Sequence, residues 1–530
     1  MSKEIYSKDV LVVGAGPTGL SLAAALTRLN ISVKIIEQKP GLSDTTKATN
    51  LMHGTQEQLA IYNLEAPMAH ISGKMERMIM EGYGQNLGAR TMHINESPFK
   101  DVLLLGQDNI ERLLAQSLNQ AGTQIDFDTK LISLTQDEIG VKATLKHGNN
   151  TTEEYYKYIV GCDGPWGVTR TFTSCNFEPV KTNRSIRQVD ARLKWKRLSS
   201  MKQMWLFYFP LGFAVVVPLL DGYSRILTIE PTENIPDRKP TLDEMRSKLI
   251  EVTQDDSIEL ADAKWFSHAN LSMGIAPGLI DRRVILAGDA GNPILPNGGQ
   301  GLNTGIQDSL NLAWKLAAII KANAPDTLLK TYESERLTLR AALEKVQFNS
   351  LKYTTNAPAF MQWAIRTLGN TLLDKGGEKQ MAKAFSQLNV SYRKSELTIK
   401  SKKSKVPSGS RIMDADLVKA TGLKEVSLFR ELCTPYWKLI YFDAKQYLKE
   451  VGNKLTNYAG KSIKPIIITS STKNIYNAQN LYYDIDELAH KVYDISGPTL
   501  LLVRPDNFIA ARVPAADFAT IDQYVKTWFK

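Results

Sequence analysis

The chain has 530 residues, is 43% hydrophobic and carries a formal net charge of +10 at pH 7. This length predicts two or three domains with sizeable cores, and the composition is that of an ordinary globular protein. The basic residues are scattered and accompany no nucleic-acid-binding motif, so the charge indicates a lysine-rich solvated surface and excludes a nucleic-acid partner.

Three cysteines, Cys162, Cys175 and Cys433, occur without CxxC spacing. This spacing excludes a disulfide scaffold and a cysteine-built metal site, and it fits a reducing compartment. The first residues lack the apolar stretch of a signal peptide, and the apolar run after them is too short for a membrane span. We therefore expect a cytoplasmic protein with no metal and no membrane partner.

The first predicted element is a buried strand over 10–13, followed by a GxGxxG turn over 14–19 and a helix with Pro17 in its first turn. A second strand over 33–36 ends in Glu37. In such a unit the turn admits a pyrophosphate and the acid accepts hydrogen bonds from a ribose. Because Glu37 would repel a 2′-phosphate, the unit predicts FAD or NAD and does not choose between them.

A polar loop then leads into a helix, and Lys47 of this loop is a candidate contact for a phosphate or a flavin. Gln107 precedes an amphipathic helix and is either a cofactor contact or only a polar first residue. Asp163 begins an Asp-Gly pair directly after a predicted strand. The end of such a strand is where open α/β sheets bind ligands, although Asp-Gly also makes ordinary turns. The predicted strands in this part are 125–133, 141–146 and 155–160.

Residues 176–279 are rich in aromatic side chains and alternate apolar with polar positions, which predicts an antiparallel sheet. One face of it is a candidate pocket for a flat ligand, with Tyr208 pointing away from Trp205. An ordinary core or surface position explains each aromatic or histidine side chain equally well. The candidate substrate contacts are Trp205, Phe207, Tyr208, Phe213 and His268. The predicted strands are 189–195, 204–209, 213–219 and 225–230, with a helix over 241–252.

A short strand, a glycine-rich loop with Asp289 and a long amphipathic helix follow over 285–320. The loop ends at the helix N-terminus, where free N–H groups and the helix dipole favour negative charge. A reduced flavin carries such charge on its pyrimidine edge, although an ordinary strand–loop–helix could contain the same glycines. Helices are predicted beyond 327, a basic linker over 396–407, and strands and helices again after 408.

Three motifs, in this order, resemble those of the FAD-dependent aromatic hydroxylases, the group A flavoprotein monooxygenases. They are GAGPTG with Glu37, VGCDGPWGVTR, and ILAGDAGNPILPNGGQGLNTGIQDSLNLAWKL. The tail, with LLVRPDNFIAAR, resembles the thioredoxin-like domain of the phenol and polyketide hydroxylase branch. The resemblance implies an α/β fold: a discontinuous Rossmann-type FAD-binding domain (1–175 and 280–345), an inserted antiparallel-sheet substrate domain (176–279), a helical segment (346–400) and a thioredoxin-like domain without CxxC (408–530).

The resemblance also implies roles for individual residues. Asp289 would bind the ribityl chain of FAD, and Pro296 and the backbone near Asn303 would border the reacting flavin. No catalytic side chain is implied. The implied cofactor contacts are Gly14, Gly16, Pro17, Thr18, Gly19, Glu37, Lys47, Gln107, Asp163, Asp289, Pro296, Gly299, Gly301, Leu302 and Asn303.

Three departures from the family pattern bear on nucleotide handling and on the substrate. Asn292 replaces a usual histidine, and Gly54 stands where many relatives have arginine. Pro165, Trp166 and Gly167 replace a usual Ala-Arg-Ser.

The implied activity is hydroxylation of a phenolic or polycyclic aromatic substrate, with polyketides and antibiotics among the candidates. FAD would be reduced transiently by NADPH or NADH and would react with O2 through a flavin C4a-hydroperoxide. An FAD-dependent oxidase or dehydrogenase, and a non-catalytic flavoprotein that binds an aromatic ligand, remain as alternatives. A homodimer is also left open.

Overall fold

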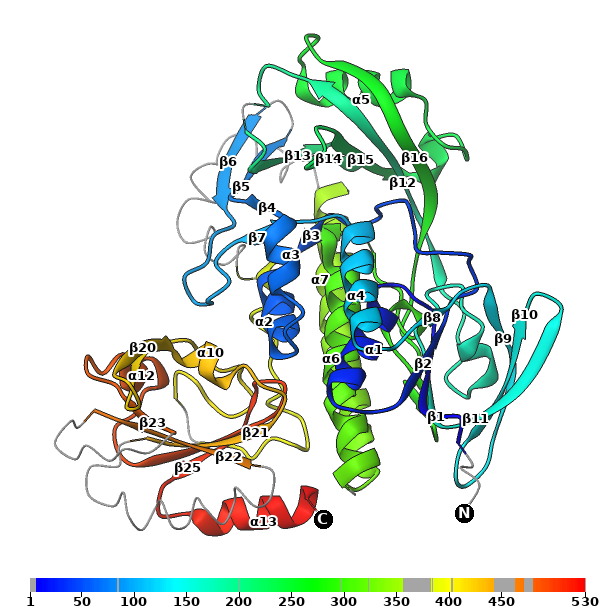
Figure 1. Cartoon of the computed structure of the whole chain (residues 1–530). Coiled ribbons are helices and arrows are strands. Elements are labelled where there is room, and N and C mark those ends of the chain that lie inside the picture. The colour runs from blue at the N-terminus through cyan, green and yellow to red at the C-terminus, as the bar shows by residue number, and fades with distance from the viewer. Residues whose placement is uncertain are drawn as a thin grey trace.

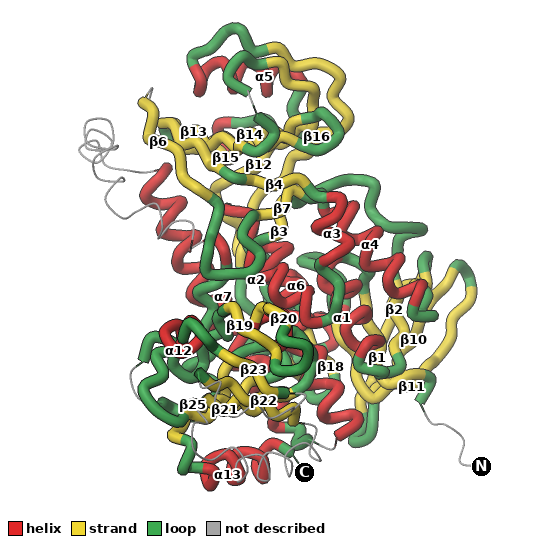
Figure 2. Tube along the Cα trace, turned by 60° about the vertical axis from the view of Figure 1, so that its left-hand side comes forward, coloured by secondary structure: helices red, strands yellow, loops and turns green. Residues whose placement is uncertain are grey.

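The computed structural model describes residues 6–82, 85–198, 200–295, 297–322, 324–355, 383, 385–401, 404–442, 463–470 and 480–529. The described strands form one eight-stranded, two seven-stranded and one three-stranded sheet. In Figure 1 one seven-stranded sheet lies at the top, the eight-stranded sheet at the right and the C-terminal sheet at the lower left. Long helices run between them, and Figure 2 shows the same arrangement from a second side.

The eight-stranded sheet is built on five parallel neighbours in the order β18-β11-β1-β2-β8. Their central side chains, such as Val10, Val12 and Val160, are fully buried, as expected for a parallel sheet covered on both faces. All predicted strands of this part are present, although a turn at Asp128 divides the one predicted over 125–133. The strands are β1 (Lys8–Val13), β2 (Val33–Ile36), β8 (Ile125–Asp126), β9 (Thr129–Gln136), β10 (Val141–His147), β11 (Asn150–Gly161), β17 (Ile280–Asp281) and β18 (Val284–Leu286).

Helices α1 (Pro17–Arg28), α4 (Gln107–Gln120) and α6 (Gln300–Ala322) share one core with this sheet. Helix α7 (Thr327–Thr355) lies beside α6, as both views show. Two shorter helices, α2 (His53–Ile61) and α3 (Ala66–Ile71), lie near a small sheet of β3 (Asn50–Leu51), β7 (Val102–Leu104) and β4 (Gly73–Met75). Within the described ranges, no helix combines the length and apolarity that a membrane span requires.

The second sheet has the order β16-β12-β15-β14-β13-β5-β6. Its strands from the predicted antiparallel region are β12 (Val180–Lys194), β13 (Gln203–Phe209), β14 (Gly212–Pro218), β15 (Ser224–Pro231) and β16 (Glu259–Met273). The sheet extends beyond that region, because β5 (Arg77–Gly82) pairs with β13 in parallel and β6 (Gln85–Thr91) pairs with β5. The predicted domain boundaries stay predictions.

The two faces of this sheet have different neighbours. Helix α5 (Leu242–Thr253), which begins with a capping box of Thr241 and Glu244, covers the face that we call the outer face. The inner face shares an apolar cluster with Leu104 of the small sheet, Met52 at the start of α2 and Leu295 in the loop before α6. The inner face is therefore the one turned toward the glycine-rich loop that precedes α6.

The C-terminal sheet has the order β20-β19-β23-β22-β21-β24-β25. The strands and the terminal helix that the sequence predicts here are present, and the thioredoxin-like assignment stays a prediction. The elements are β19 (Asp416–Lys419), β20 (Lys424–Ser427), α10 (Leu428–Leu432), β21 (Trp437–Phe442), β22 (Ile463–Thr469), β23 (Leu481–Tyr483), α12 (Leu488–Tyr493), β24 (Thr499–Val503), β25 (Ile509–Pro514) and α13 (Phe518–Trp528).

The predicted helical segment and linker correspond only partly to the structure. Of the segment 346–400, α7 covers the first part to Thr355, most of the middle lies outside the described residues, and 387–400 contains no helix. The predicted linker does not run free, because Leu397 is fully buried and the Ile399 N–H donates to the Ala510 oxygen at 2.8 Å. The burial of Leu397 and the partial burial of Ile399 outweigh the polar composition on which the linker prediction rested.

Candidate functional site

The glycine-rich turn joins β1 to α1, and its glycines meet different surroundings. A Cβ atom at Gly14, whose φ is +104°, would lie 2.6 Å from the Cys162 oxygen, and one at Gly19 would overlap the Gly14 oxygen. A Cβ atom at Gly16 would meet nothing within 4 Å. The first and third glycines therefore close the turn against protein, whereas Gly16 faces open space at the N-terminus of α1, where a pyrophosphate fits.

Glu37 lies beside this turn at the end of β2. Its carboxylate accepts the Ala15 N–H at 2.9 Å and the Lys39 N–H at 3.0 Å. These bonds fix the carboxylate next to the open side of the turn and leave it lone pairs for a ribose hydroxyl.

The loop that begins at Gly288 meets the same turn at Thr18. Gly288 has a φ of +62°, and a Cβ atom there would lie 2.6 Å from the Thr18 hydroxyl oxygen. A Cβ atom at Gly305 of α6 would lie 2.5 Å from the same oxygen. Two segments more than half the chain apart, predicted to close around one dinucleotide, thus touch at Thr18. Because Thr18 and Pro17 stand in the first turn of α1, their backbone borders the open space at Gly16.

Asp289 follows Gly288 in the short helix η3 (Gly288–Ala290). Burial raises the pKa of its carboxyl to about 6, with Arg340 and Lys47 opposing the rise and Asp308 adding to it. Among the described residues its carboxylate has no hydrogen-bond partner. Such a carboxylate suits the role predicted for it, which is to accept a hydroxyl of the ribityl chain.

The flavin loop, residues 297–301, leads from η4 (Asn297–Gly299) into α6. Gly298 and Gly299 have φ values of +76° and +66°, which glycine adopts without strain. A Cβ atom at Gly301 would meet nothing within 4 Å, so the first turn of α6 is open on this side. Pro296, which was predicted to border the flavin, lies outside the described residues.

Asn303 fixes the flavin loop from within α6. Its amide nitrogen donates to the Asn50 and Gly299 oxygens at 2.9 Å, and its amide oxygen accepts the Met52 N–H at 2.8 Å. Leu302 beside it packs against the main core. The Asn303 side chain is occupied by these bonds to the backbone. The groups that this end of α6 offers to an anionic flavin edge are therefore its backbone N–H groups.

A buried ionic cluster, which was not predicted from the sequence, holds the loop at Gly288. Asp308 of α6 accepts the Gly288 N–H at 3.1 Å and is paired with Arg336, at 2.5 Å, and with Arg340. Burial alone would raise the pKa of Asp308, but the two guanidinium groups hold it below its usual value. The sequence did contain a signal for this cluster. Asp308 is the one acidic residue of the mainly apolar helix α6, and Arg336 and Arg340 stand one turn apart on α7.

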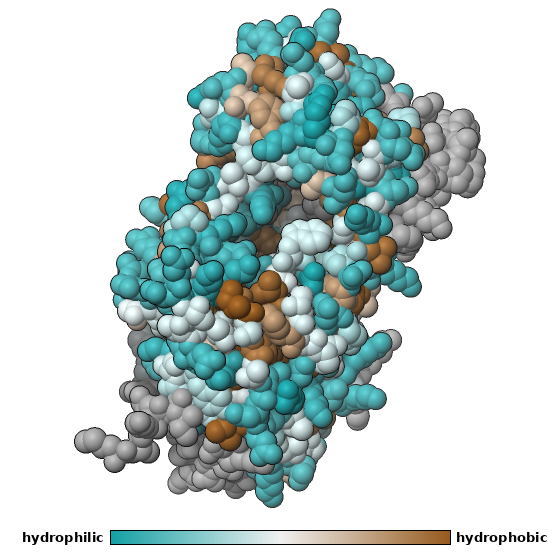
Figure 3. Space-filling model, turned by 90° about the vertical axis from the view of Figure 1, so that its right-hand side faces the viewer, coloured by the Kyte–Doolittle hydropathy of each residue, from teal (hydrophilic) through white to brown (hydrophobic). Residues whose placement is uncertain are grey.

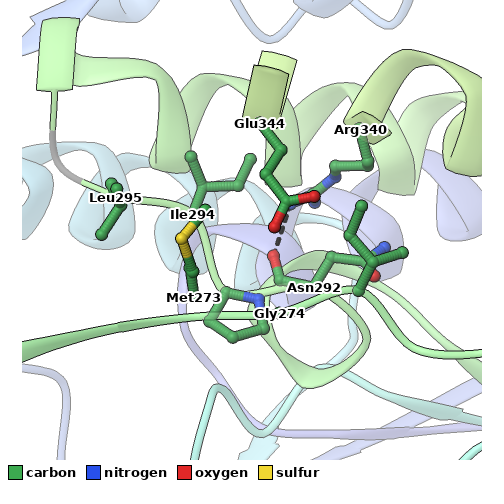
Figure 4. A pocket seen from close by; sticks show the side chains of 9 residues that line it. Met273, Gly274, Asn292, Ile294, Leu295, Arg340 and Glu344 are labelled. Carbon is green, nitrogen blue, oxygen red and sulfur yellow. Dashed lines mark hydrogen bonds between the residues drawn. The ribbon is translucent and has the colours of Figure 1, made fainter. Parts of the chain in front are cut away.

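Asn292, the departure from the usual histidine, is a structural residue in this fold. Its side-chain oxygen accepts the Ala276 N–H at 2.9 Å, and its backbone oxygen accepts a bond from Arg340 at 2.6 Å. Figure 4 shows this bond at a small pocket, into which Glu344 of α7 also points. The other lining residues are Met273, Gly274, Ile275 and 293–295.

The Asp-Gly motif uses its carboxylate mainly on its own loop. Asp163 accepts the Thr169 N–H at 2.8 Å and the Thr169 hydroxyl at 2.9 Å, while its second oxygen has no partner in the described structure. Burial raises the pKa of this carboxyl. Arg170 is buried with its guanidinium 5.0 Å from the Phe177 ring, and Trp166 is 77% exposed.

Lys47 and Gln107 both lie near the buried carboxylate of Glu111. The Gln107 amide donates to Glu111 at 2.8 Å, and the charge of Lys47 opposes the burial that raises the pKa of Glu111. The charge of Lys47, which is exposed, also opposes the rise in the pKa of Asp289, so it acts on both carboxylates.

A second, open pocket lies between the start of α4 and the turn that joins β14 to β15. It is lined by Thr46, Thr49, 104–106, Asp108, Asn109, 218–221 and Lys264. Arg225 of the sheet, itself paired with Asp190, donates to the Thr46 oxygen and so ties the sheet to the loop that carries Lys47. Figure 3 shows the molecule hollowed between its upper and lower parts, with apolar residues at the lower edge of the hollow.

The five candidate substrate residues lie on opposite faces of the seven-stranded sheet. Tyr208 and Phe213 belong to the inner face, and burial raises the pKa of Tyr208 to about 12. Trp205 and Phe207 belong to the outer core under α5, with ring planes 3° apart and centroids 6.0 Å apart. His268 is also on the outer face, 3.5 Å from Asp237 and opposite Arg187 in the register. The structure thus brings only Tyr208 and Phe213 near the flavin loop, because alternate residues of a strand face opposite sides.

Comparison with known proteins places this geometry in a family. The model of the family described as FAD binding domain matches residues 7–347. A flavin-dependent monooxygenase of Mycobacteroides abscessus is 26% identical, over 94% of this chain and 96% of its own length. A rifampicin monooxygenase of Streptomyces venezuelae is 31% identical, over 62% of this chain and 68% of its own length.

The fold recurs in solved structures. An anhydrotetracycline hydroxylase from Streptomyces rimosus has a TM-score of 0.77 at 24% identity, with 98% of this chain and 99% of that chain covered. An aklavinone-11 hydroxylase solved with FAD and aklavinone has a TM-score of 0.75 at 22% identity, with 99% of both chains covered. With the contact of Gly288 and Gly305 at Thr18 of the glycine turn, the family model and the sequence relatives show that the chain belongs to the FAD binding domain family and is one of its flavin-dependent aromatic monooxygenases, which are oxidoreductases.

Proposed function

We propose that the protein hydroxylates an aromatic substrate of phenolic or polycyclic type with FAD, O2 and either NADH or NADPH. The observation that carries the proposal is that Gly288 and Gly305, on either side of the flavin loop, meet the glycine turn at Thr18. Leu295, just before the flavin loop, packs in the apolar cluster of the inner sheet face. Bound FAD would supply the redox chemistry: it accepts a hydride from the nicotinamide and activates O2 to deliver one oxygen atom to the ring, the second oxygen leaving as water.

The residues of the chain would bind and orient the cofactor. The open space at Gly16 and the N-terminus of α1 receive the pyrophosphate, Glu37 receives the ribose, and the free carboxylate of Asp289 receives the ribityl chain. The N-terminus of α6 stabilises negative charge at the pyrimidine edge of the flavin. Asn303 keeps that helix end in place through its three backbone partners.

The substrate would lie between the flavin loop and the inner face of the sheet. Tyr208 and Phe213 stand on this face, and the Tyr208 hydroxyl has no hydrogen-bond partner among the described residues. The pKa of about 12 keeps Tyr208 protonated at neutral pH, so it can donate to a substrate oxygen. The apolar surroundings exclude water from the reacting ring. The relatives named for rifampicin and anhydrotetracycline support a substrate of several rings.

The test is to purify the protein, measure bound FAD by its absorbance, and follow NADH and NADPH oxidation with a panel of phenols and polycyclic aromatics under ¹⁸O2. We expect yellow protein, ligand-stimulated oxidation and one ¹⁸O atom in the product. A modified product without label would instead support an oxidase or dehydrogenase. Ligand binding without any nucleotide oxidation would support a non-catalytic flavoprotein.

A further inference from the structure

A short segment, residues 385–388, lies against the site from a part of the chain distant from both dinucleotide motifs. Its anchor is Gln387, which is 9% exposed and has a left-handed φ of +59°. The Gln387 side chain bonds to four side chains of α2 and α6. It accepts from Gln307 at 2.6 Å and from Thr55 at 3.1 Å, and it donates to Thr304 at 3.2 Å and to Gln300. A fully used buried amide network of this kind fixes one position of the backbone.

The glycine at position 54 is what allows this segment to approach. A Cβ atom at Gly54 would lie 2.7 Å from the Gln387 oxygen and 3.0 Å from its carbonyl carbon. Any larger side chain at the start of α2 would push the segment away from α6. Gly54 and Gln387 therefore act together as an anchor.

Phe385 is the residue that this anchor holds in place. Its ring packs against the inner-face cluster, and a Cβ atom at Gly298 of the flavin loop would lie 2.7 Å from the ring. The Gln300 amide donates to the Phe385 oxygen at 3.4 Å. The ring thus touches both the loop that faces the flavin and the sheet face that would hold the substrate.

The rest of the inner-face cluster is rich in methionine. Seven of the 14 methionines of the chain belong to it or pack against it. Methionine side chains are flexible and polarizable, so a surface built from them adapts to ligands of different outline. The methionines are Met52, Met75, Met78, Met80, Met92, Met204 and Met273. In such surroundings an anchored aromatic ring is the stiffer part of the wall.

We propose that Phe385, anchored by Gln387 against Gly54, determines how large a fused aromatic system the substrate site accepts. This proposal rests on the proposed function, because it assumes that an aromatic ligand occupies the inner face. The ring closes the space between flavin loop and sheet, and the methionines adapt around the ligand that remains.

The test compares two probes, phenol with one ring and alizarin with three, by titration calorimetry on the FAD-loaded protein. In Phe385→Ala the affinity for alizarin relative to phenol should rise about tenfold. Gln387→Ala, which frees the segment without shortening the ring, should shift the ratio in the same direction by less. Phe266→Ala, which removes a partly buried ring from the outer face of the same sheet, should leave the ratio unchanged.

The outcomes separate this inference from the proposed function. A wild-type protein that binds neither probe contradicts both. A wild-type protein that binds them, with a ratio unchanged in Phe385→Ala and Gln387→Ala, contradicts only the role of Phe385. If the alanine variant does not retain FAD, Phe385→Leu gives the same comparison with a smaller truncation, and the same two readings apply.

Discussion

At the scale of single residues, the glycine turn shows how one residue type serves two purposes. Gly14 and Gly19 are required by neighbouring backbone, whereas Gly16 meets no protein atom that would exclude a side chain. The open space at Gly16, at the N-terminus of α1, is the place that we propose for the pyrophosphate.

Substitution of the two kinds of glycine by alanine should have different effects. Gly16→Ala should change the free energy of unfolding of the FAD-free protein by less than about 0.5 kcal/mol, because its φ of −78° suits alanine. Its FAD affinity should fall at least about tenfold. Gly19→Ala should destabilise the FAD-free protein by about 3 kcal/mol, because its Cβ overlaps the Gly14 oxygen. Denaturant unfolding and FAD titration measure both effects, and equal FAD affinity in Gly16→Ala and wild type would contradict the assignment.

Asp289 predicts a pH dependence. Because burial raises its pKa from 3.8 to about 6, the folded FAD-free protein holds a proton there that the unfolded chain has lost. The bound proton stabilises the folded protein. This contribution to the free energy of unfolding is fully present below about pH 4 and is lost as the pH rises to about 6. The amide in Asp289→Asn does not ionise, so this variant does not lose stability in this way. The melting temperature of the variant minus that of wild type should therefore increase as the pH rises through this window.

The FAD affinity of wild type should follow the opposite trend. It should rise with pH through the same window, because the ionised carboxylate is the better acceptor for a ribityl hydroxyl. Asp289→Asn should lose this rise. Parallel pH profiles of the two proteins, in thermal melts and in FAD titrations, would argue against a role of Asp289 in binding.

At the scale of elements, the two faces of strand β13 pack in different apolar clusters, and the proposed function gives them different roles. Phe207 stacks in the core beneath α5, and Tyr208 stands on the inner face beside Phe213. A strand that separates a stabilising face from a binding face allows substitutions one residue apart to have separate effects.

Substitutions on the two faces of β13 should therefore differ in kind. Phe207→Ala should lower the free energy of unfolding by about 3–5 kcal/mol and leave the affinity for a phenolic ligand unchanged in the folded fraction. Tyr208→Phe should leave stability within about 1 kcal/mol and weaken phenol binding about threefold to tenfold through the lost hydroxyl. Denaturant unfolding and calorimetry test both, and a Phe207→Ala variant with altered ligand affinity would contradict the separation of faces.

At the scale of the whole molecule, a buried ionic cluster joins the C-terminal sheet to the helices of the FAD site. Glu335 of α7 is fully buried and accepts from Arg504 at 2.6 Å and from Lys315 of α6 at 2.8 Å. Arg504 is also paired with Asp506 at 2.6 Å. Helix α6, whose first turn belongs to the proposed flavin site, is thus fixed at its far part by the C-terminal unit.

Removing the charge of Glu335 should lower the free energy of unfolding. Glu335→Gln leaves two buried cations with reduced compensation and should destabilise the protein by about 3–5 kcal/mol. The matched control is Glu259→Gln, which breaks an exposed pair with Lys194 and should cost less than about 1 kcal/mol. Denaturant unfolding of both variants measures the difference, and similar midpoints would show that the cluster does not fix the C-terminal unit.

The sequence by itself determined the elements whose causes are local. The glycine spacing before α1, the acid after β2 and the period of α6 each follow from neighbouring residues, so the dinucleotide unit, the flavin loop and most strands could be predicted. The family also followed from the sequence, because its motifs record contacts with the cofactor.

Only the tertiary structure decided which residues meet across the fold. Alternation showed that Trp205 and Tyr208 face opposite ways but not which face meets the flavin loop, since that depends on where the sheet packs. The contact of Gly54 with Gln387, and the pairing of Asp308 with two arginines, join positions far apart in the chain. Such contacts depend on the packing of helices and sheets against one another, which the local pattern of residues does not encode.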